Sequence, residues 1–426
     1  MSKFGSVSFE GSRDESGDPD IVYYNGSIIN NKTAIDTGAD PIVRFIETRD
    51  IPLVKDCSKY QFSIVRFTMN GPGRDIPLFI PLIKVGAENP TNNINLTIYS
   101  CSLDLNVSYI RGGITYTNSF TTTQSVIWEP EYTDLSVASP PLPSTCQTGQ
   151  DISTRYYYCN TYTWWVSLVN KALRNCVTDL QTQFNAWWIA TVPAPFQPPP
   201  TLGTKAPQMT YNPTTNLFSI YAPTYSFGFE NRTAPATDDE EATLYFGENL
   251  YGMFANFKSI YRNLSNRRTV EIYIEDILDG ANTVTYGGVN YFLTIQDYES
   301  TSMLWSPVES IVFCSGLLPV VNEATSDPIR FGDGNDTVLQ TTISAFSPIV
   351  TDVAVFQTNG SGYKSYLEYA PTAEYRMASM SRSKTAINSI DIQVYWKNRL
   401  TGELTPVQMY NGSSVSIKIM LRKIGA

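Results

Sequence analysis

Histidine is absent from this chain of 426 residues. Imidazole is the commonest general base, the commonest transition-metal ligand and the usual partner of a nucleophilic Ser or Cys. Its absence excludes hydrolysis by a Ser-His-Asp or Cys-His arrangement. Catalysis by carboxylates remains possible.

Cysteine is sparse, and no pair has the C-x-x-C spacing of a zinc or redox site. The six cysteines are Cys57, Cys101, Cys146, Cys159, Cys176 and Cys314. The chain also lacks an apolar run of about 18 residues, so we expect no membrane span. Its first residues, "MSKFGSVSFEGSRDESGDPD", contain no apolar core of a secretory signal. We therefore expect synthesis in the cytoplasm, with reduced thiols and no metal or cofactor.

Positive charge is in deficit. The net charge is −10, and the isoelectric point is about 4.7. Nucleic-acid contact is not expected, because such surfaces carry a basic bias. The chain also lacks a Gly-rich phosphate loop, a G-x-S-x-G nucleophile motif and a dinucleotide fingerprint.

Short β-type runs make up most of the sequence. They are rich in Ile, Val, Tyr and Phe, and Gly, Pro, Asn and Asp separate them. In "YQFSIVRFTM" (60–69) both faces carry apolar residues, which is typical of a central strand in a packed sandwich. In "SIDIQVYWK" (389–397) and "SSVSIKIMLRK" (413–423) apolar and polar residues alternate, which predicts strands with one buried face. Many short strands with few helices predict an all-β sandwich or barrel.

One long helix is predicted at about residues 160–188, between the Pro-rich segments 139–147 and 192–200. Its apolar residues recur at spacings of three and four and form a single stripe. This stripe consists of Trp165, Leu168, Val169, Leu173, Cys176, Leu180 and Phe184. We expect the stripe to pack on the core of the sheet, although such a stripe could also bind a partner. Downstream, residues 206–223 predict a hairpin with its turn at 212–216, and residues 248–257 predict a short helix.

The stretch "AIDTGADP" (34–41) reads like the catalytic turn of a retrovirus-type aspartic protease, in which Asp36 would be the active-site carboxylate. Such an enzyme needs two facing carboxylates that share a proton. The chain has one Asp-Thr-Gly only, and the residues before it, "NNKTAI", are not an apolar strand. Asp, Gly and Pro at these positions also make a good turn. We interpret Asp36 as a turn residue and predict no catalytic residue and no enzyme.

Three polar clusters could bind a ligand, and each also has a plain structural interpretation. Asp333, Asn335 and Asp336 in "RFGDGNDT" could hold calcium, but such residues are also common in loops. The acidic run "TDDEEAT" (237–243) is interpreted as a solvated loop tip rather than a metal site. Arg262, Arg267 and Arg268 could contact nucleic acid or an acidic neighbouring subunit, but we favour a solvated turn before a strand.

Two tryptophan pairs flank the predicted helix. Trp164–Trp165 and Trp187–Trp188 could stack on bases or sugars. Their position at the ends of an amphipathic helix favours a place in the core or in a subunit interface instead. No assembled active site follows from these motifs.

Several patches in a fixed order resemble one family, the penton-type minor capsid proteins of polinton-like viruses and virophages. The patches extend over about residues 20–426. They are "YQFSIVRFTM…IPLFIPLI" (60–83), "APQMTYNPTTNLFSIYAP" (206–223), "ENLYGMFANF" (248–257), "WSPVESIVFCSGLLPVVNE" (305–323) and "IDIQVYWKNRLTGELTPVQMYNGSSVSIKIMLRK" (390–423).

The resemblance implies a jelly-roll β-sandwich that forms homopentamers at the five-fold vertices of an icosahedral capsid. The implied partners are other copies of the chain, the surrounding capsomers of the major capsid protein and other minor capsid proteins. The implied location is the virion, after assembly in the host cytoplasm. A trimeric minor capsid protein beneath the shell fits the same patches. Two alternatives stay open: a virion attachment or carbohydrate-binding β-sandwich, and the aspartic protease.

We divide the chain on this basis into a mobile N-terminal arm at 1–19, a discontinuous jelly-roll core at 20–138 and 261–426, and an insertion at 139–260. The insertion would contain the helix, the Pro-rich loops and the hairpin. A second β-sandwich is the competing account of the middle of the chain.

Overall fold

The computed structural model places most of the chain in strands, with one long helix. The residues that it describes are 3–13, 17–31, 41–71, 76–84, 93–131, 155–227, 238–264, 267–274, 283–298, 305–321, 323–324, 346–347, 349–354, 366–370, 377–380, 384–399 and 402–425. Across these ranges, no helix combines the length and the apolarity that crossing a membrane requires.

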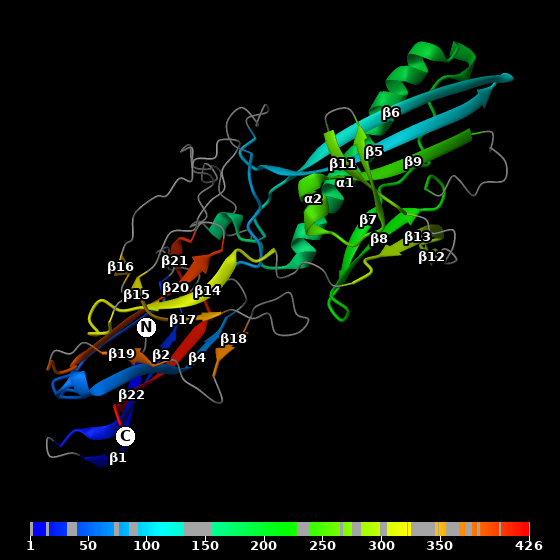
Figure 1. The fold of residues 1–426 in the computed structure, drawn as a ribbon. Coiled ribbons are helices and arrows are strands. Elements are labelled where there is room, and N and C mark those ends of the chain that lie inside the picture. Colours follow the sequence, from blue (N-terminus) through cyan, green and yellow to red (C-terminus); the bar gives the residue numbers. More distant parts are fainter. Residues whose placement is uncertain are drawn as a thin grey trace. The chain divides into compact units, whose positions relative to one another are not determined.

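The chain folds into two compact units. Unit 1 comprises residues 1–77, 306–357 and 363–426, and unit 2 comprises residues 78–305 and 358–362. Most of unit 2 is thus one continuous insertion in the chain of unit 1 (Figure 1).

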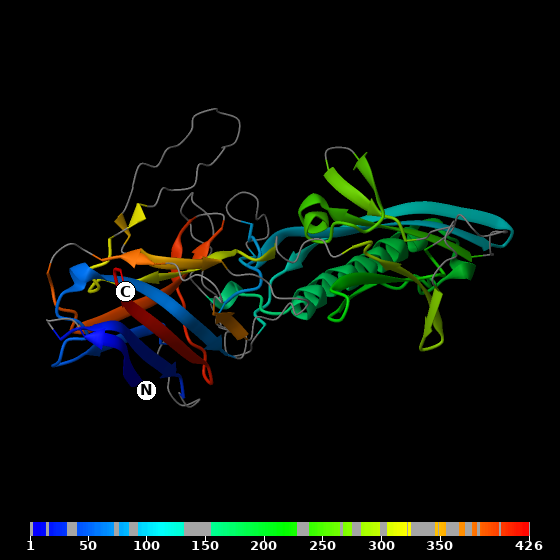
Figure 2. The same cartoon turned by 60° about the horizontal axis from the view of Figure 1, so that its bottom comes forward.

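Unit 1 contains two antiparallel sheets. The first has the order β1-β2-β22-β4-β18, and β19 also pairs with β4. Its strands are β1 (Lys3–Arg13), β2 (Pro19–Ile29), β22 (Ser414–Lys423), β4 (Tyr60–Asn70), β18 (Tyr366–Tyr369) and β19 (Ala378–Ser379). The N-terminal and C-terminal strands therefore lie in the same sheet, and β22 pairs with β2 on one side and β4 on the other (Figure 2).

The second sheet of unit 1 has the order β17-β14-β20-β21, and β3 also pairs with β20. Its strands are β17 (Ile349–Ala354), β14 (Val308–Cys314), β20 (Ser389–Asn398), β21 (Leu404–Pro406) and β3 (Arg44–Thr48). The described part of unit 1 also contains a two-stranded sheet of β15 (Glu323–Ala324) with β16 (Phe346–Ser347) and the 3-10 turn η1 (Cys57–Lys59).

The core of unit 1 lies between its two sheets, as in a jelly-roll sandwich. The rings of Phe67 on β4 and Phe313 on β14 meet edge to face, with centroids 5.0 Å apart. The predicted alternation is confirmed in both C-terminal strands. The inward residues of β20 and β22 are buried, namely Ile390, Ile392, Val394, Trp396, Val415, Ile417, Ile419 and Leu421. The all-β jelly-roll prediction is therefore confirmed.

Unit 2 also contains two antiparallel sheets. The larger has the order β10-β11-β9-β5-β6, and the smaller has the order β12-β13-β8-β7. The larger sheet consists of β10 (Ser259–Leu264), β11 (Arg267–Ile272), β9 (Asp238–Gly247), β5 (Leu96–Arg111) and β6 (Ile114–Ile127). The smaller sheet consists of β12 (Thr283–Tyr286), β13 (Val289–Ile295), β8 (Leu217–Pro223) and β7 (Gln208–Asn212).

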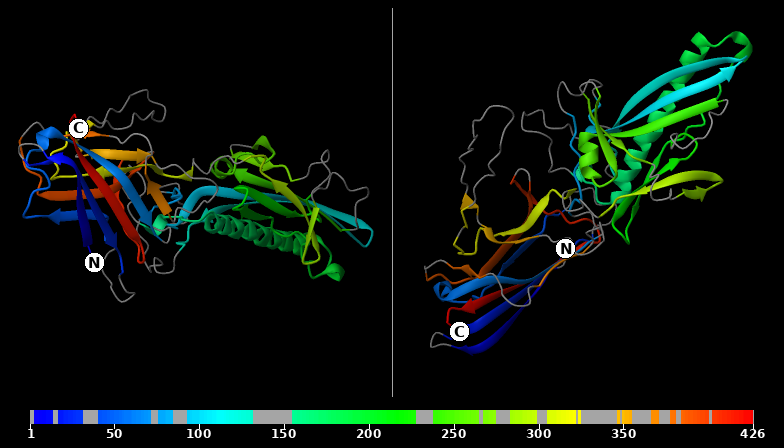
Figure 3. Two further views of the ribbon diagram at one scale, coloured as in Figure 1. Left: turned by 90° about the horizontal axis from the view of Figure 1, so that it is seen from below. Right: turned by 45° about the vertical axis from the view of Figure 1, so that its right-hand side comes forward.

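The helices of unit 2 follow the predictions closely. They are α1 (Tyr162–Thr191) and α2 (Glu248–Met253), with 3-10 turns η4 (Arg155–Tyr157) and η5 (Ala194–Phe196). Thr161 caps the N-terminus of α1, because its hydroxyl accepts a hydrogen bond from Trp164 N. Pro193 follows the last turn of the helix. All seven residues of the predicted stripe are buried. The helix runs along strands β5 and β6 (Figure 3), so the stripe packs on the sheet, as expected.

The limits of the insertion differ from the predicted 139–260. Strands β5 and β6 precede residue 139 and β12 and β13 follow residue 260, yet all four belong to unit 2. Alternation within a strand says which side chains are buried but not which strand it will pair with. The first residues differ as well, because β1 pairs with β2 from Lys3 to Arg13 instead of forming a mobile arm.

Candidate functional site

The acidic run at 238–241 lies on strand β9 and not at a solvated loop tip. Asp239 and Glu240 are buried, with 3% and 1% of their surfaces exposed. The prediction was wrong because residues 238–241 pair with strand β5, and the backbone at residues 203–204 donates hydrogen bonds to Glu240. A local run of charges carries no information about the distant donors that stabilise it.

Glu240 is the centre of a buried hydrogen-bond network. Its Oε1 accepts from Tyr109 Oη at 2.7 Å and from Gly203 N at 2.8 Å. Its Oε2 accepts from Thr204 N at 2.7 Å and from the Thr204 hydroxyl. The carboxylate thus holds the chain at 203–204 against the sheet. Burial and the bond to Glu240 raise the pKa of Tyr109, so its hydroxyl stays protonated and donates.

Asp238 forms an ion pair at the end of the same strand. Arg111 Nη1 and Nη2 donate to its two carboxylate oxygens at 2.5 and 2.9 Å. The guanidinium also lies 5.4 Å from the ring centres of Tyr109 and Trp188, close enough for a cation–π interaction. Strand β5, strand β9 and the end of α1 are therefore joined around one arginine.

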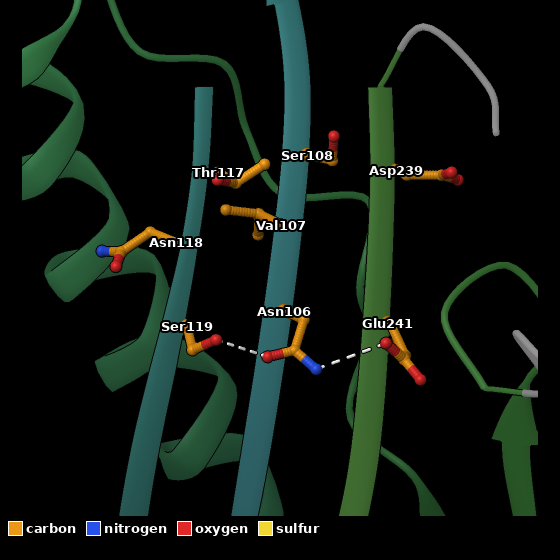
Figure 4. A pocket seen from close by; sticks show the side chains of 8 residues that line it. All are labelled: Asn106, Val107, Ser108, Thr117, Asn118, Ser119, Asp239 and Glu241. Carbon is orange, nitrogen blue, oxygen red and sulfur yellow. Dashed lines mark hydrogen bonds between the residues drawn. The ribbon is translucent and has the colours of Figure 1, made fainter. Parts of the chain in front are cut away.

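The opposite face of the larger sheet carries a shallow polar cavity of about 390 Å³. Strands β5, β6 and β9 supply its lining, which is Asn106, Val107, Ser108, Thr117, Asn118, Ser119, Asp239 and Glu241. Figure 4 shows Asn106 between Ser119 and Glu241. The Ser119 hydroxyl donates to Asn106 Oδ1 at 2.6 Å, and Asn106 Nδ2 donates to Glu241 Oε2 at 3.3 Å.

The lining of this cavity determines what it can do. It offers hydroxyl, amide and carboxylate groups, and it contains no aromatic ring on which a sugar could stack. In the part of the chain that the structure describes, no three Cys, Asp or Glu side chains are grouped as a metal site would require. The cavity is a hydrogen-bonding surface of negative charge.

The remaining predicted ligand residues lie mostly outside the described residues. These are the candidate protease residue Asp36 and the candidate calcium ligands Asp333, Asn335 and Asp336. For the arginine cluster the structure describes the backbone only. Arg262 lies on β10, and Arg267 and Arg268 lie on β11, where Leu264 pairs with Arg267. Strands β10 and β11 therefore pair as antiparallel neighbours, and the residues between them, 265–266, lie outside the described residues.

The tryptophans at the ends of α1 belong to the core of unit 2. Trp165 and Trp188 are fully buried, and Trp164 Nε1 donates to Glu129 O at 2.9 Å. Trp187 is half-buried, and its ring lies 5.8 Å from that of Phe120 on β6. The expected core position is confirmed for Trp165 and Trp188, whereas Trp164 and Trp187 are half-buried.

An aromatic cluster around Trp305 was not predicted. The Trp305 ring stacks on the ring of Phe218 of β8, with centroids 5.4 Å apart, and meets the ring of Phe254 edge to face, with centroids 5.3 Å apart. Its Nε1 donates to Met253 O at 2.9 Å. The ring of Tyr162 of α1 also packs edge to face on the Trp305 ring, with centroids 5.0 Å apart. The cluster joins the hairpin β7–β8, α1 and α2. Neither the spacing nor the periodicity of these distant residues could have indicated it.

Comparison with known proteins agrees with this architecture. The family described as Sputnik minor capsid protein V18/19 matches residues 22–423. A relative described as "Uncharacterized protein V18", from Sputnik virophage, is 29% identical over 180 residues, which cover 42% of this chain and 96% of that protein.

Two solved structures share the fold. A chain in the cryo-EM structure of the Sputnik virophage is 24% identical, with a TM-score of 0.67 and coverage of 95% of this chain and 98% of that chain. The crystal structure of the mavirus penton protein is 12% identical, with a TM-score of 0.52 and coverage of 95% and 99%. The family match extends through both units, and this chain therefore belongs to the Sputnik minor capsid protein V18/19 family.

Proposed function

We propose that this chain is the penton of an icosahedral capsid and that five copies form a ring at each five-fold vertex. The observation that carries the proposal is the likeness of the whole chain, both units included, to the mavirus penton protein. Membership of a minor capsid family supports a structural role in the virion. The major capsid protein around the vertex would be the second partner, and assembly would take place in the host cytoplasm.

A ring of identical subunits uses contacts between two different surfaces of each copy, and it closes only at one rotation. Unit 1 supplies a rigid jelly roll for such contacts, because its inward residues from both sheets are buried. Several large apolar side chains on unit 1 remain exposed, among them Ile51, Leu317 and Val321. Neighbouring subunits in a shell would cover part of such surface.

The attachment and protease alternatives receive less support. The described cavity lacks the exposed Trp and Tyr expected of a carbohydrate site. The protease alternative depends on Asp36, which lies outside the described residues. Both alternatives are therefore outcomes of the experiment below rather than second proposals.

The test is the native mass of the full-length protein together with its position in the particle. We expect an assembly of five times 47.6 kDa and ring-shaped class averages with five-fold symmetry. In a reconstruction of the virion we expect density for this chain at the vertices. A trimer, or density beneath the shell away from the vertices, would overturn the penton proposal. So would a dimer that cleaves peptides and loses this activity with Asp36→Asn.

Two substitutions on strand β20 control for folding. Ile392 is fully buried, so Ile392→Asp should unfold the jelly roll and abolish the ring. Lys397 lies on the same strand and forms an exposed ion pair with Glu309 at 3.0 Å. Lys397→Ala should keep the ring, since exposed pairs contribute little to stability.

A further inference from the structure

Two buried thiols lie against each other in unit 2. Cys101 is on β5, which lies between β9 and β6 in the larger sheet. Cys176 is in the middle of α1, and both side chains are fully buried. Their Sγ atoms are 4.0 Å apart, although the residues are 75 positions apart in the sequence. Neither C-x-x-C spacing nor any other local pattern would have paired them.

The surroundings hold both sulfurs in the same gap. Cys176 Sγ approaches Cys101 O at 3.8 Å, and Cys101 Sγ approaches Gln124 O of β6 at 3.9 Å. On α1 the neighbouring stripe residues Leu173 and Leu180 are fully buried, so the helix is fixed along the sheet. The thiols therefore meet as a consequence of the packing of α1 and not through a mobile loop.

We propose that Cys101 and Cys176 are a latent disulfide site that joins α1 covalently to β5 on oxidation. A disulfide needs an Sγ–Sγ distance of about 2.0 Å, so the sulfurs must approach by roughly 2 Å. Rotation of the side chains about their Cα–Cβ bonds would bring them closer, because both sulfurs face the same gap. The bond would close a loop of 75 residues, and such a cross-link stabilises a protein by restricting its unfolded state.

The reaction requires a two-electron oxidant, for which hydrogen peroxide serves. One thiolate attacks a peroxide oxygen, the O–O bond breaks, and a sulfenic acid and water form. The second sulfur then attacks the sulfenic sulfur, so that the S–S bond forms, the S–O bond breaks and a second water leaves. In total, two thiols and one peroxide give one disulfide and two waters.

The pair should stay reduced while the protein is in a reducing cytoplasm. Contact with Cys176 and burial raise the pKa of Cys101, and few thiolates form at neutral pH. Oxidation is therefore expected to be slow and to become faster as the pH rises. In a released virion the surroundings are oxidising. This timing rests on the proposed function, whereas the chemistry of the pair does not.

The test uses the purified full-length protein, reduced and then exposed to hydrogen peroxide. Remaining thiols are alkylated after denaturation, and peptides are identified by mass spectrometry. We expect alkylation to detect two fewer of the six thiols after oxidation. We also expect a peptide in which Cys101 is linked to Cys176 and a higher midpoint of thermal unfolding. Alkylation of both residues under conditions that oxidise an exposed thiol peptide would overturn the proposal, as would a linked protein with no higher midpoint.

Matched variants separate this pair from other buried thiols. Cys101→Ala and Cys176→Ala should each abolish the oxidation-dependent rise in the unfolding midpoint. Cys159 is also buried in unit 2, and its Sγ contacts Thr161 O at 3.2 Å, so Cys159→Ala should retain the rise. If either variant at the pair does not fold, the linked peptide and the unfolding midpoint of the oxidised wild-type protein together test the proposal. The native mass reports on the penton proposal independently, since a pentamer without the linked peptide overturns only the disulfide site.

Discussion

At the scale of single residues, the contacts of carboxylate side chains anchor strand β9 in unit 2. Strand β9 carries four consecutive acidic residues, and Asp238, Glu240 and Glu241 illustrate three kinds of contact. Asp238 pairs with a cation, Glu240 accepts four hydrogen bonds, and Glu241 accepts one at the rim of the cavity. A buried carboxylate is tolerated when its lone pairs are satisfied in this way.

Glu240→Gln should destabilise unit 2 by roughly 2–4 kcal/mol. The amide NH₂ cannot accept a hydrogen bond, so two of the four donors around the carboxylate would lose their acceptor. Urea unfolding, followed by the fluorescence of the buried tryptophans, measures the loss. Glu241→Gln is the control, because its single described bond is 3.3 Å long, and we expect a change below about 0.5 kcal/mol. Equal losses in the two variants would contradict the network.

Because of Tyr99, the free energy of unfolding should fall at alkaline pH. Burial raises its pKa from 10 to about 12. The folded state therefore keeps a proton that the unfolded state loses near pH 10. The contribution to stability is complete below pH 10 and is lost as the pH rises from 10 to 12. Its size is roughly 3 kcal/mol, since each unit of pKa shift corresponds to about 1.4 kcal/mol.

The measurement is the free energy of unfolding in urea between pH 9 and 12. The fall above pH 10 should be shallower in Tyr99→Phe than in the wild type. Tyr286 is 79% exposed, so Tyr286→Phe should behave like the wild type. The assignment to Tyr99 fails if the two variants give the same slope.

At the scale of elements, helix α1 is stabilised by packing more than by its own preference for helix. Of its thirty residues, the buried ones form one stripe that faces β5, β6 and β7. Thr122 of β6 donates to Asp179 at 2.5 Å, and Asn170 exchanges two hydrogen bonds with the backbone of Met209 on β7. The periodicity of the sequence was sufficient to predict the stripe. The strands that receive it became evident only in the structure.

Leu173→Ala should destabilise unit 2 by about 2–5 kcal/mol, because Leu173 is fully buried and its removal leaves a cavity between α1 and the sheet. Its neighbour Arg174 is exposed on the opposite face of the helix, and Arg174→Ala should change the stability by less than about 0.5 kcal/mol. Circular dichroism during thermal unfolding measures both. Loss of stability in the arginine variant alone would mean that the buried face is assigned incorrectly.

At the scale of the whole molecule, the chain passes from unit 1 into unit 2 after β4 and returns before β14. The first sheet of unit 1 brings together strands from both ends of the chain, since β22 lies between β2 and β4. Each unit has buried side chains and sheets of its own. This arrangement predicts that the insertion can fold without the jelly roll.

A fragment of residues 78–305 should therefore fold on its own. We expect a single cooperative unfolding transition and protection of the amides of β5 and α1 from hydrogen exchange. The matched comparison is a fragment of residues 139–260, which lacks β5, β6, β12 and β13 and should not fold. An unfolded fragment 78–305 would mean that unit 2 depends on unit 1.

The class of the fold, the long helix, the hairpin and the inward faces of the last strands could be predicted from the sequence. These features depend on local periodicity and on turn residues, which neighbouring positions encode. The absence of histidine and the ordered patches also favour a structural capsid protein.

Four features became evident only from the three-dimensional fold. They are the start of the insertion, the burial of the acidic run, the aromatic cluster around Trp305 and the contact of Cys101 with Cys176. Each of these features joins residues that are far apart in the chain, such as Glu240 with Tyr109, 131 positions away. The free energy that stabilises these contacts comes from pairing and packing between strands and helices. No local pattern in the sequence specifies which distant element will supply the partner.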